Sequence, residues 1–362
     1  MRPSLVALRL QEGGLIAVII VLGALLTTFG GTVKVPVFAD GPDGRPQRVM
    51  TVDEQGRSVP TMVERNKFLR LENLAQLAKD ASFIAIMAVG MTFVIVAGGI
   101  DLSVGAIYAL AAVTGAIVLR ALGPDGTQAP AGLAVIAGAG ACVATGVAAG
   151  VANGALTVGL RVHPFIITLG TMLILRCIAF VATGGESVGD FPPLLGAIVR
   201  WDVGGIALGP LIVTVAVLLV GGALLGLHVF GRHVYAVGGN ELASRYSGVR
   251  VGRVRIAVFA IAGLCAGIAA LVALGYYGSA SSGDGDGYEL KVIAAAVVGG
   301  ASLSGGKGTA LGAVLGALLI QMIDTGIVFL GIPQAISMGV IGVAIVLAVV
   351  LDQVSRRVTQ AR

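Results

Sequence analysis

The sequence is dominated by apolar stretches long enough to cross a lipid bilayer, and this feature constrains the fold more than any other. Hydrophobic residues make up 56% and charged residues 12% of the 362-residue chain, whereas soluble domains contain about 25% charged residues. A backbone inside a bilayer must satisfy its polar groups internally, so uninterrupted apolar stretches of roughly 20 residues form helices. We therefore expect an all-α, polytopic integral membrane protein with a single transmembrane domain, residues 1–362.

Ten apolar windows are the candidate membrane spans. They lie near residues 14–35, 74–98, 103–121, 131–157, 164–183, 207–229, 255–277, 289–301, 309–330 and 333–351. The eighth window is too short for an ordinary span. It is interpreted either as a half-helix or as the apolar end of a longer, tilted helix.

The loops between these windows differ in charge, which predicts the orientation of the chain. The loop over residues 230–255 carries five arginines and a single acid, Glu241, and an excess of basic residues marks a cytoplasmic loop. Residues 184–206 and 278–289 each carry three acids, with one base in the first loop and none in the second. With an even number of spans, both termini are then expected in the cytoplasm.

A polar insert over residues 35–65 interrupts the apolar pattern after the first window. It is rich in proline, glycine and mixed charge, and the predicted orientation places it on the outer side of the membrane. Residues 49–52 and 58–63 have the composition of two strands that pair around residues 54–56. A small hairpin and a disordered excursion both remain open for this insert.

The stretch GGIDLSVG places Asp101 and Ser103 between the second and third windows. The glycines break the helix, and the acid is then suited to cap the helix that follows. Alternatively, the break lies beside a pathway and Asp101 contacts cargo or gates it, because ionisable residues at membrane depth are costly. A similar stretch, GGASLSGG, spans residues 299–306, which suggests a weak internal repeat.

Four more polar residues lie inside apolar windows. Arg176 and Asp324 are charged, and each is interpreted either as snorkelling or paired structurally, or as lining a polar route. Asn153 and Gln321 are uncharged candidates for the same route. Alternatively, they form hydrogen bonds between packed helices.

The sequence contains no recognisable catalytic machinery. In GGASLSGGKGT a phosphate-binding loop would need glycine at Ala301 and Ser or Thr at Gly308, so both ends of that motif fail. No hydrolase or metal-site pattern is present either. The chain is therefore expected to have no catalytic residues, no metal, no cofactor and no nucleic-acid partner, and uphill transport would need an ion gradient or a separate ATPase.

The basic loop contains a short segment, NELASRYSG, with the signals of a helix. Asn240 is the expected N-cap, Glu241 lies in the first turn, and Gly248 is the expected stop. The segment is either an ordinary inner loop, with arginines that only set topology, or a helix along the membrane surface that docks a cytoplasmic partner.

Four stretches together resemble the permease subunits of bacterial ABC importers for monosaccharides of the ribose, xylose and galactose type. They are AIMAVGMTFVIVAGGIDLSVGA, PFIITLGTMLILR, GRHVYAVGGNELASRYSGV and GYELKVIAAAVVGGASLSGGKGT, in the same order and spacing. The resemblance implies about ten helices, some of them broken, in the bacterial inner membrane. It also implies a second permease copy, identical or paralogous, a periplasmic sugar-binding protein, and a cytoplasmic ATP-binding subunit that drives alternating access.

The same resemblance assigns the basic loop to ATPase coupling. The residues that carry this role over are Gly238, Gly239, Asn240, Glu241, Ala243, Arg245 and Gly248. Leu242 and Tyr246 depart mildly from the family pattern. The main alternative is an ion-coupled secondary transporter of a small polar solute, with Asp101 and Asp324 as the ion sites.

Two further departures concern the pathway. Lys291 stands where the family often has an acid or small residue, and Asp324 stands where it often has asparagine. The insert replaces a short outer connection, which suggests that it modifies docking of the binding protein.

Overall fold

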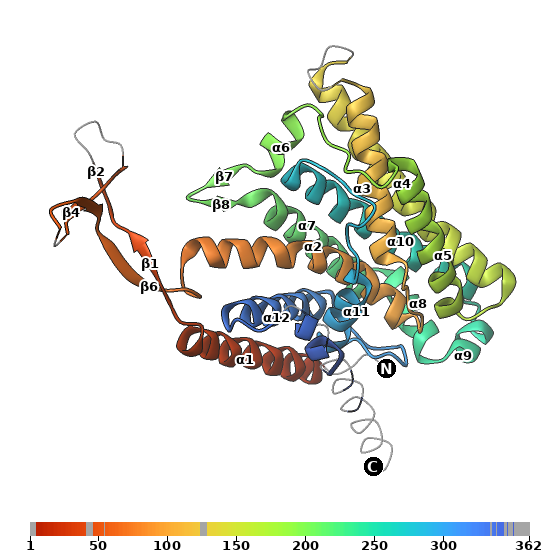
Figure 1. Cartoon of the computed structure of the whole chain (residues 1–362). Helices are drawn as coiled ribbons and strands as arrows, with labels where there is room; N and C mark the ends of the chain where they lie inside the picture. Colours follow the sequence, from red (N-terminus) through yellow and green to blue (C-terminus); the bar gives the residue numbers. More distant parts are fainter. Residues whose placement is uncertain are drawn as a thin grey trace.

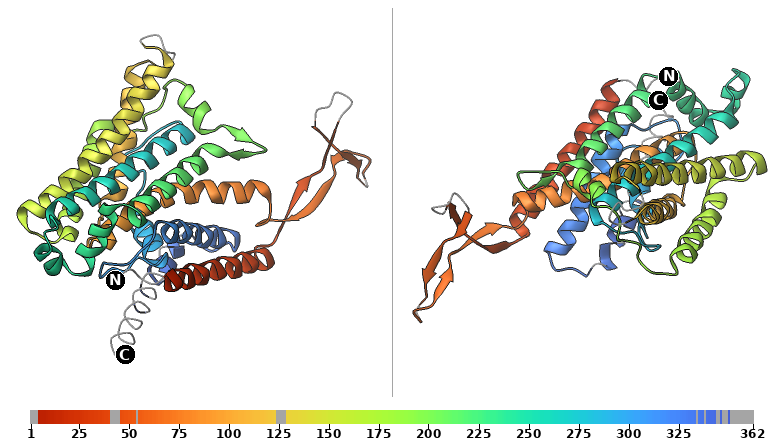
Figure 2. Two further views of the ribbon diagram at one scale, coloured as in Figure 1. Left: turned by 180° about the vertical axis from the view of Figure 1, so that it is seen from behind. Right: turned by 90° about the horizontal axis from the view of Figure 1, so that it is seen from above.

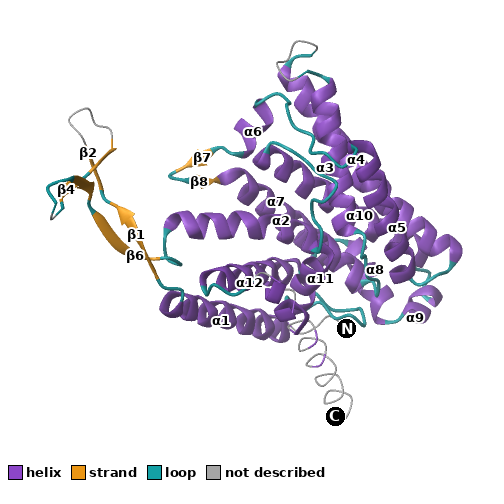
Figure 3. Cartoon of the chain, in the orientation of Figure 1, coloured by secondary structure: helices purple, strands orange, loops and turns teal. Residues whose placement is uncertain are grey.

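The computed structural model describes residues 5–40, 46–53, 55–123 and 129–333, together with residues 335–337, 339–343, 346 and 350. Within these residues the chain is mostly helical (Figures 1 and 3), which confirms the all-α prediction. Eight helices are long and apolar enough to cross a membrane. They are α1 (Leu5–Phe29), α2 (Leu71–Val96), α3 (Val104–Ala121), α4 (Ala131–Leu160), α5 (Pro164–Thr183), α7 (Leu208–Gly226), α10 (Val251–Tyr277) and α12 (Ala310–Phe329).

Four helices of the described chain are shorter: α6 (Leu194–Val199), α8 (Val229–Gly239), α9 (Glu241–Tyr246) and α11 (Tyr288–Val298). The predicted eighth span corresponds to α11, whose 11 residues rise only about 17 Å. It is therefore a half-helix and not the end of a longer one. The predicted tenth span, 333–351, lies partly outside the described residues.

The first helix is shorter at its end than the sequence suggests. It ends at Phe29, six residues before the predicted boundary, and a β-strand begins at Thr32. Gly31, with φ of 77°, turns the chain out of the helix. The prediction failed because Val33, Val35 and Val37 are as apolar as a helix interior but belong to strands and their connections.

Helix α2 lies at the centre of the bundle. Every residue from Phe83 to Val96 is buried, and the helix packs against α7, α10, α11 and α12 (Figure 2). Its hydrophobic surface on all sides is typical of a helix inside a helical core. In contrast, α1 and α5 keep large apolar side chains exposed, such as Ile20 and Val181, which suits contact with lipid tails.

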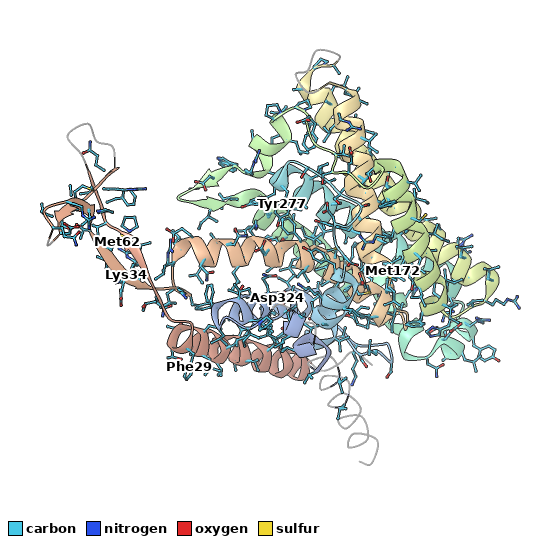
Figure 4. The ribbon with its side chains drawn as sticks, viewed as in Figure 1. Phe29, Lys34, Met62, Met172, Tyr277 and Asp324 are labelled. Atoms are coloured by element: carbon cyan, nitrogen blue, oxygen red, sulfur yellow. The ribbon has the colours of Figure 1, made fainter. Side chains whose placement is uncertain are left out.

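The polar insert forms an arm of three antiparallel strand pairs that extends away from the helices (Figures 1 and 4). The pairs are β1 (Thr32–Pro36) with β6 (Met62–Asn66), β2 (Phe38–Asp40) with β3 (Pro46–Arg48), and β4 (Met50–Val52) with β5 (Ser58–Pro60). The last pair confirms the predicted hairpin. A separate small hairpin joins β7 (Asp202–Val203) to β8 (Ile206–Ala207).

The two similar glycine-rich segments, residues 98–105 and 299–306, each follow the end of a helix, α2 at Val96 and α11 at Val298. The backbone N–H of Gly306 donates to the Val96 carbonyl oxygen at 2.8 Å. The last residue of the second segment is therefore bonded directly to the end of α2.

Helices α4 and α10 approach each other closely through glycines. Gly146, Gly150 and Gly154 recur every fourth residue on α4, so they share one face. A Cβ atom on Gly146 would lie 2.2 Å from the carbonyl oxygen of Gly263 on α10. Small residues with this spacing let membrane helices pack backbone to backbone.

We predict that Gly146→Val destabilises the protein, whereas Gly140→Val on the same helix does not. The added side chain at Gly146 has no room, and such overpacking costs about 1–3 kcal/mol. A Cβ at Gly140 meets nothing within 4 Å. Thermal unfolding of the purified protein in detergent measures the difference, and equal melting temperatures for the two variants would contradict this packing.

Candidate translocation pathway and coupling segment

The break between α2 and α3 holds a buried chain of polar side chains. The Asp101 Oδ1 atom accepts hydrogen bonds from the Ser103 backbone N–H at 2.8 Å and from its hydroxyl at 2.6 Å. The Asn153 amide on α4 donates to the Ser103 Oγ atom at 2.7 Å. All three residues are fully buried, so three of the six predicted pathway residues form one cluster.

Asp101 does not occupy the N-cap position. Helix α3 begins at Val104, with Ser103 at the N-cap, two residues later than a helix capped by Asp101 would begin. The carboxylate instead satisfies the Ser103 N–H in the turn before the helix. Burial raises the pKa of Asp101, and the hydrogen bonds from the Ser103 hydroxyl and backbone N–H oppose that rise.

Thr168 on α5 hydrogen bonds to the backbone of the same break, and the sequence did not indicate it. Its hydroxyl accepts from the Leu102 N–H at 3.1 Å and lies 3.3 Å from the Ile100 carbonyl oxygen, to which it can donate. The residue belongs to the PFIITLG stretch, but a single threonine in an apolar helix carries no signal that it pairs with a distant turn.

Arg176 lies apart from the Asp101 cluster and holds a different segment. Its guanidinium donates to the carbonyl oxygens of Ser282 and Asp284 at 2.8 and 2.7 Å, and it lies 3.9 Å from the Asp286 carboxylate. It therefore fixes the connection between α10 and α11. Its main partners are backbone carbonyls, which a sequence pattern cannot reveal.

Asp324 forms a third, separate cluster. Its Oδ2 atom lies 2.6 Å from the Lys291 Nζ atom, and the Ser337 hydroxyl donates to Oδ1. Gln321 lies one turn before Asp324 on α12 and is half-buried. The two residues that depart from the family pattern, Lys291 and Asp324, thus neutralise each other across α11 and α12. Figure 4 labels Asp324 within the helical bundle.

A cavity of about 360 Å³ lies between α3, the end of α10 and the start of α11. Its size falls within the roughly 300–1,000 Å³ of small-molecule pockets. Three tyrosines line it together with Ser279 and Asp284: Tyr108, Tyr277 and Tyr288. The sequence analysis did not single out these tyrosines, because they come from three helices that only the fold brings together.

The cavity wall contains one carboxylate and no basic side chain. Burial raises the pKa of Asp284, opposed by its hydrogen bond from the Ser281 N–H and by Arg176. Among the described residues no group of three His, Cys, Asp or Glu side chains is placed to hold a metal ion. The cavity is therefore suited to hydrogen bonding and to stacking against aromatic rings.

The predicted helix in the basic loop is confirmed as α9. The Asn240 side chain accepts from the Ala243 N–H at 2.9 Å as the N-cap, and Gly248, with φ of 83°, follows the helix. Glu241 pairs with Arg245 at 2.9 Å and with Arg255 at 2.5 Å.

Helix α9 has exposed apolar side chains on its surface. Leu242 and Tyr246 are 61% and 82% exposed, and Ala243 is also exposed. Large exposed apolar side chains beside charged ones are typical of a contact surface.

Gly238, near the end of α8, links the basic loop to the core of the bundle. A Cβ atom there would lie 1.7 Å from the Val96 carbonyl oxygen and 2.7 Å from the Gly306 nitrogen. The end of α8 therefore packs directly on the end of α2. A Cβ atom added to the next residue, Gly239, would meet nothing within 4 Å. The backbone of Gly239 is nevertheless close to Gly306, since a Cβ atom on Gly306 would lie 3.0 Å from the Gly239 Cα atom.

The helical part of this chain after the arm is that of a membrane permease component. Residues 73–349 match the model of a family described as the branched-chain amino acid transport system / permease component, and the chain belongs to that family. The match begins after the arm, so α1 and the arm lie outside it.

Several characterised permeases are similar to this chain over most of its length. The ribose import permease of Escherichia coli is 38% identical over 288 residues, which cover 79% of this chain and 87% of that one. The ribose import permease of Bacillus subtilis is 37% identical, over 79% and 86% of the two chains. The D-allose transport system permease of Escherichia coli is 37% identical, over 79% and 85%. No solved structure matches the chain.

We predict that Lys291→Met and Asp324→Asn each destabilise the protein, and that the double variant regains part of the loss. Each single change leaves one unpaired charge inside the bundle. The expected cost is about 3 kcal/mol, the lower end for buried pairs, because the Lys291 side chain keeps 23% of its exposure. Thermal unfolding measures all three variants.

Lys34→Met on the exposed face of β1 is the matched control. It removes the same charge without breaking a buried pair, so its melting temperature should equal that of the unaltered protein. Strictly additive losses in the double variant would contradict the pairing of Lys291 with Asp324.

Proposed function

We propose that this chain is the membrane-spanning permease subunit of an ABC importer for a monosaccharide. The observation that carries the proposal is its similarity to ribose and D-allose import permeases over nearly four-fifths of its length. The eight long apolar helices are consistent with this role. ATP hydrolysis is assigned to a separate cytoplasmic subunit, and a periplasmic binding protein delivers the sugar.

The cavity chemistry favours a neutral sugar over an amino acid. A zwitterionic amino acid needs opposite charges for its two ends, and the cavity wall offers only the Asp284 carboxylate. A sugar has hydroxyls for Asp284 and Ser279 and apolar ring faces for the tyrosines, and Tyr108 and Tyr288 lie with ring centroids 5.6 Å apart. We assign this cavity to the outer part of the pathway.

The coupling segment gives a physical route from the ATPase to the pathway. A partner that binds the exposed face of α9 would displace α8, and Gly238 at the end of α8 packs on the end of α2. Movement of α2 alters the break that holds Asp101, Ser103 and Asn153. The pathway then switches between outward-facing and inward-facing forms. Arg176 and Asp324 hold segments along it, and Gln321 lies one turn from Asp324.

The orientation and assembly follow from the same proposal. The arginine-rich end that carries α8 and α9 faces the cytoplasm, as do both termini. The acidic loops and the arm face the periplasm. A second permease copy, identical or paralogous, completes the pathway in the bacterial inner membrane.

Reconstitution into proteoliposomes with the cognate ATPase and binding protein tests the function. We expect ATP-dependent uptake of a neutral monosaccharide that continues when a protonophore collapses the proton gradient. Branched-chain amino acids should not compete. Uptake that stops with the protonophore while ATP is maintained would instead favour an ion-coupled transporter.

We predict that Glu241→Ala or Arg245→Ala weakens coupling between ATP hydrolysis and transport roughly fivefold. Loss of a partly exposed ion pair costs about 1 kcal/mol, and Glu241 orients both Arg245 and Arg255. The measurement is sugar transported per ATP hydrolysed. Arg253→Ala, in the first turn of α10, removes a nearby charge that makes no ion pair with Glu241, so it is the control. Unchanged transport together with unchanged stimulated ATPase activity would refute the assignment.

We predict that the arm contributes to docking of the binding protein. Because Gly31 and Lys67 are joined by a backbone hydrogen bond at the base of the arm, residues 32–66 can be replaced by a short glycine linker without separating α1 from α2. Uptake at limiting binding-protein concentration should fall, while melting temperature and basal ATPase activity stay constant. Unchanged uptake would exclude this role.

A further inference from the structure

The buried row of hydrogen-bonded side chains between α2 and α3 leaves one oxygen unpaired at each end. The Asn153 amide donates to the Ser103 hydroxyl oxygen, and the Ser103 hydroxyl donates to Asp101 Oδ1. The other oxygens of the two end groups, Asp101 Oδ2 and Asn153 Oδ1, are buried and have no hydrogen-bond partner. Leaving buried polar atoms unpaired costs free energy, so two orphans in one cluster need an explanation.

The direction of the two hydrogen bonds follows from the Ser103 hydroxyl. A hydroxyl has one hydrogen to give. Asp101 Oδ1 accepts the Ser103 backbone N–H, so it is an unprotonated oxygen and also accepts the hydroxyl hydrogen. Ser103 must then receive a hydrogen from the Asn153 NH₂ group. The Asn153 carbonyl oxygen is consequently directed away from Ser103, and reversing the amide would bring two acceptors together.

We propose that Asp101 is a carboxylic acid in the folded protein, and that its proton lies on Oδ2 and is donated to Asn153 Oδ1. Asn153, Ser103 and Asp101 then form a closed ring in which each group donates one hydrogen bond and accepts one. A single proton satisfies both orphaned oxygens. The break between the helices thus contains a proton site, held between α4 and the start of α3.

The surroundings favour a neutral acid. Burial without a counter-charge penalises the ionised form, and Asp101 makes no ion pair with any described residue. The charged groups on the elements packed around the break are occupied or directed elsewhere. Arg176 is bonded to the carbonyls of Ser282 and Asp284, and Arg255 pairs with Glu241.

The remaining titratable groups near the break lie on either side of it, in the turn between α4 and α5 and on α11. Arg161 and His163, in the turn between α4 and α5, line a separate cavity together with Gly98 and Arg245. On the other side, the Glu289 carboxylate of α11 lies against Gly105 in the first turn of α3. None of them provides a hydrogen bond or an ion pair to Asp101.

The ring makes Asp101 a positioning residue and not a coupling-ion site. It joins the residues just before α3 to α4, while Thr168 joins the same turn to α5. Because the end of α2 also supports Gly238, the ring fixes the geometry of the junction that the coupling segment contacts. This inference does not depend on the identity of the cargo.

Infrared difference spectroscopy of the purified protein at neutral pH tests the ring. Subtracting the spectrum of Asp101→Asn from that of the unaltered protein should leave a protonated-carboxyl C=O band. Asp53→Asn is the control: that carboxylate pairs with Arg57 on the exposed arm, so the same subtraction should leave only carboxylate bands. A difference spectrum for Asp101 that contains only carboxylate bands would overturn the proposal.

Two further variants separate the ring from a purely structural role. Asparagine at position 101 presents an NH₂ group where the acid presents its hydroxyl, so Asp101→Asn should keep the melting temperature while Asp101→Ala lowers it. Asn153→Ala keeps the acid but removes its acceptor, so the C=O band should persist at a shifted position. An unshifted band in Asn153→Ala would contradict the ring.

A bound cation is the competing occupant of the two orphaned oxygens. Replacing sodium chloride with choline chloride should leave the melting temperature of the unaltered protein unchanged if the site holds a proton. A fall that Asp101→Asn abolishes would instead establish a sodium site and exclude the ring.

Discussion

The contact between Gly238 and the backbone of Val96 is the constraint on which the rest of the arrangement depends. Glycine is required there because a Cβ atom would overlap the Val96 carbonyl oxygen. The same carbonyl accepts the hydrogen bond from Gly306. Three chain segments that are far apart in sequence therefore meet at the end of the central helix, and none can move far without the others. A motion imposed on α8 would therefore reach α2, whose second half is entirely buried.

The polar side chains inside the bundle are arranged in small clusters in which charged and polar groups pair with one another. Lys291 neutralises Asp324, Arg176 is satisfied by two carbonyl oxygens, and Asp101 is bonded to Ser103, which Asn153 bonds in turn. Isolated charges at membrane depth are expensive, so such groups are paired or bonded. The cavity between α3, α10 and α11 has an aromatic wall with one carboxylate, which suits hydrogen bonding and ring stacking better than tight binding of an ion.

Local features were the most predictable from the sequence. The cap at Asn240, the stop at Gly248 and the hairpin of the arm depend on neighbouring residues only, and the structure confirms them. The partners of the buried polar residues were not predictable. Lys291 and Asp324 each looked like an isolated departure from the family pattern, yet they lie on adjacent helices and compensate each other. The tyrosines of the cavity were missed for the same reason, because they are distant in sequence.

The sequence by itself determined the class of protein, since long apolar stretches have only the helical solution in a bilayer. It also located most of the long helices, although the bounds of α1 were wrong by six to nine residues. Its ordered motifs also identified the permease family. The tertiary structure alone decided which polar groups pair, where the cavity lies, and that the end of α8 touches the end of α2. These features depend on backbone approaches of a few ångströms between distant segments, and apolar periodicity carries no information about which helix faces meet.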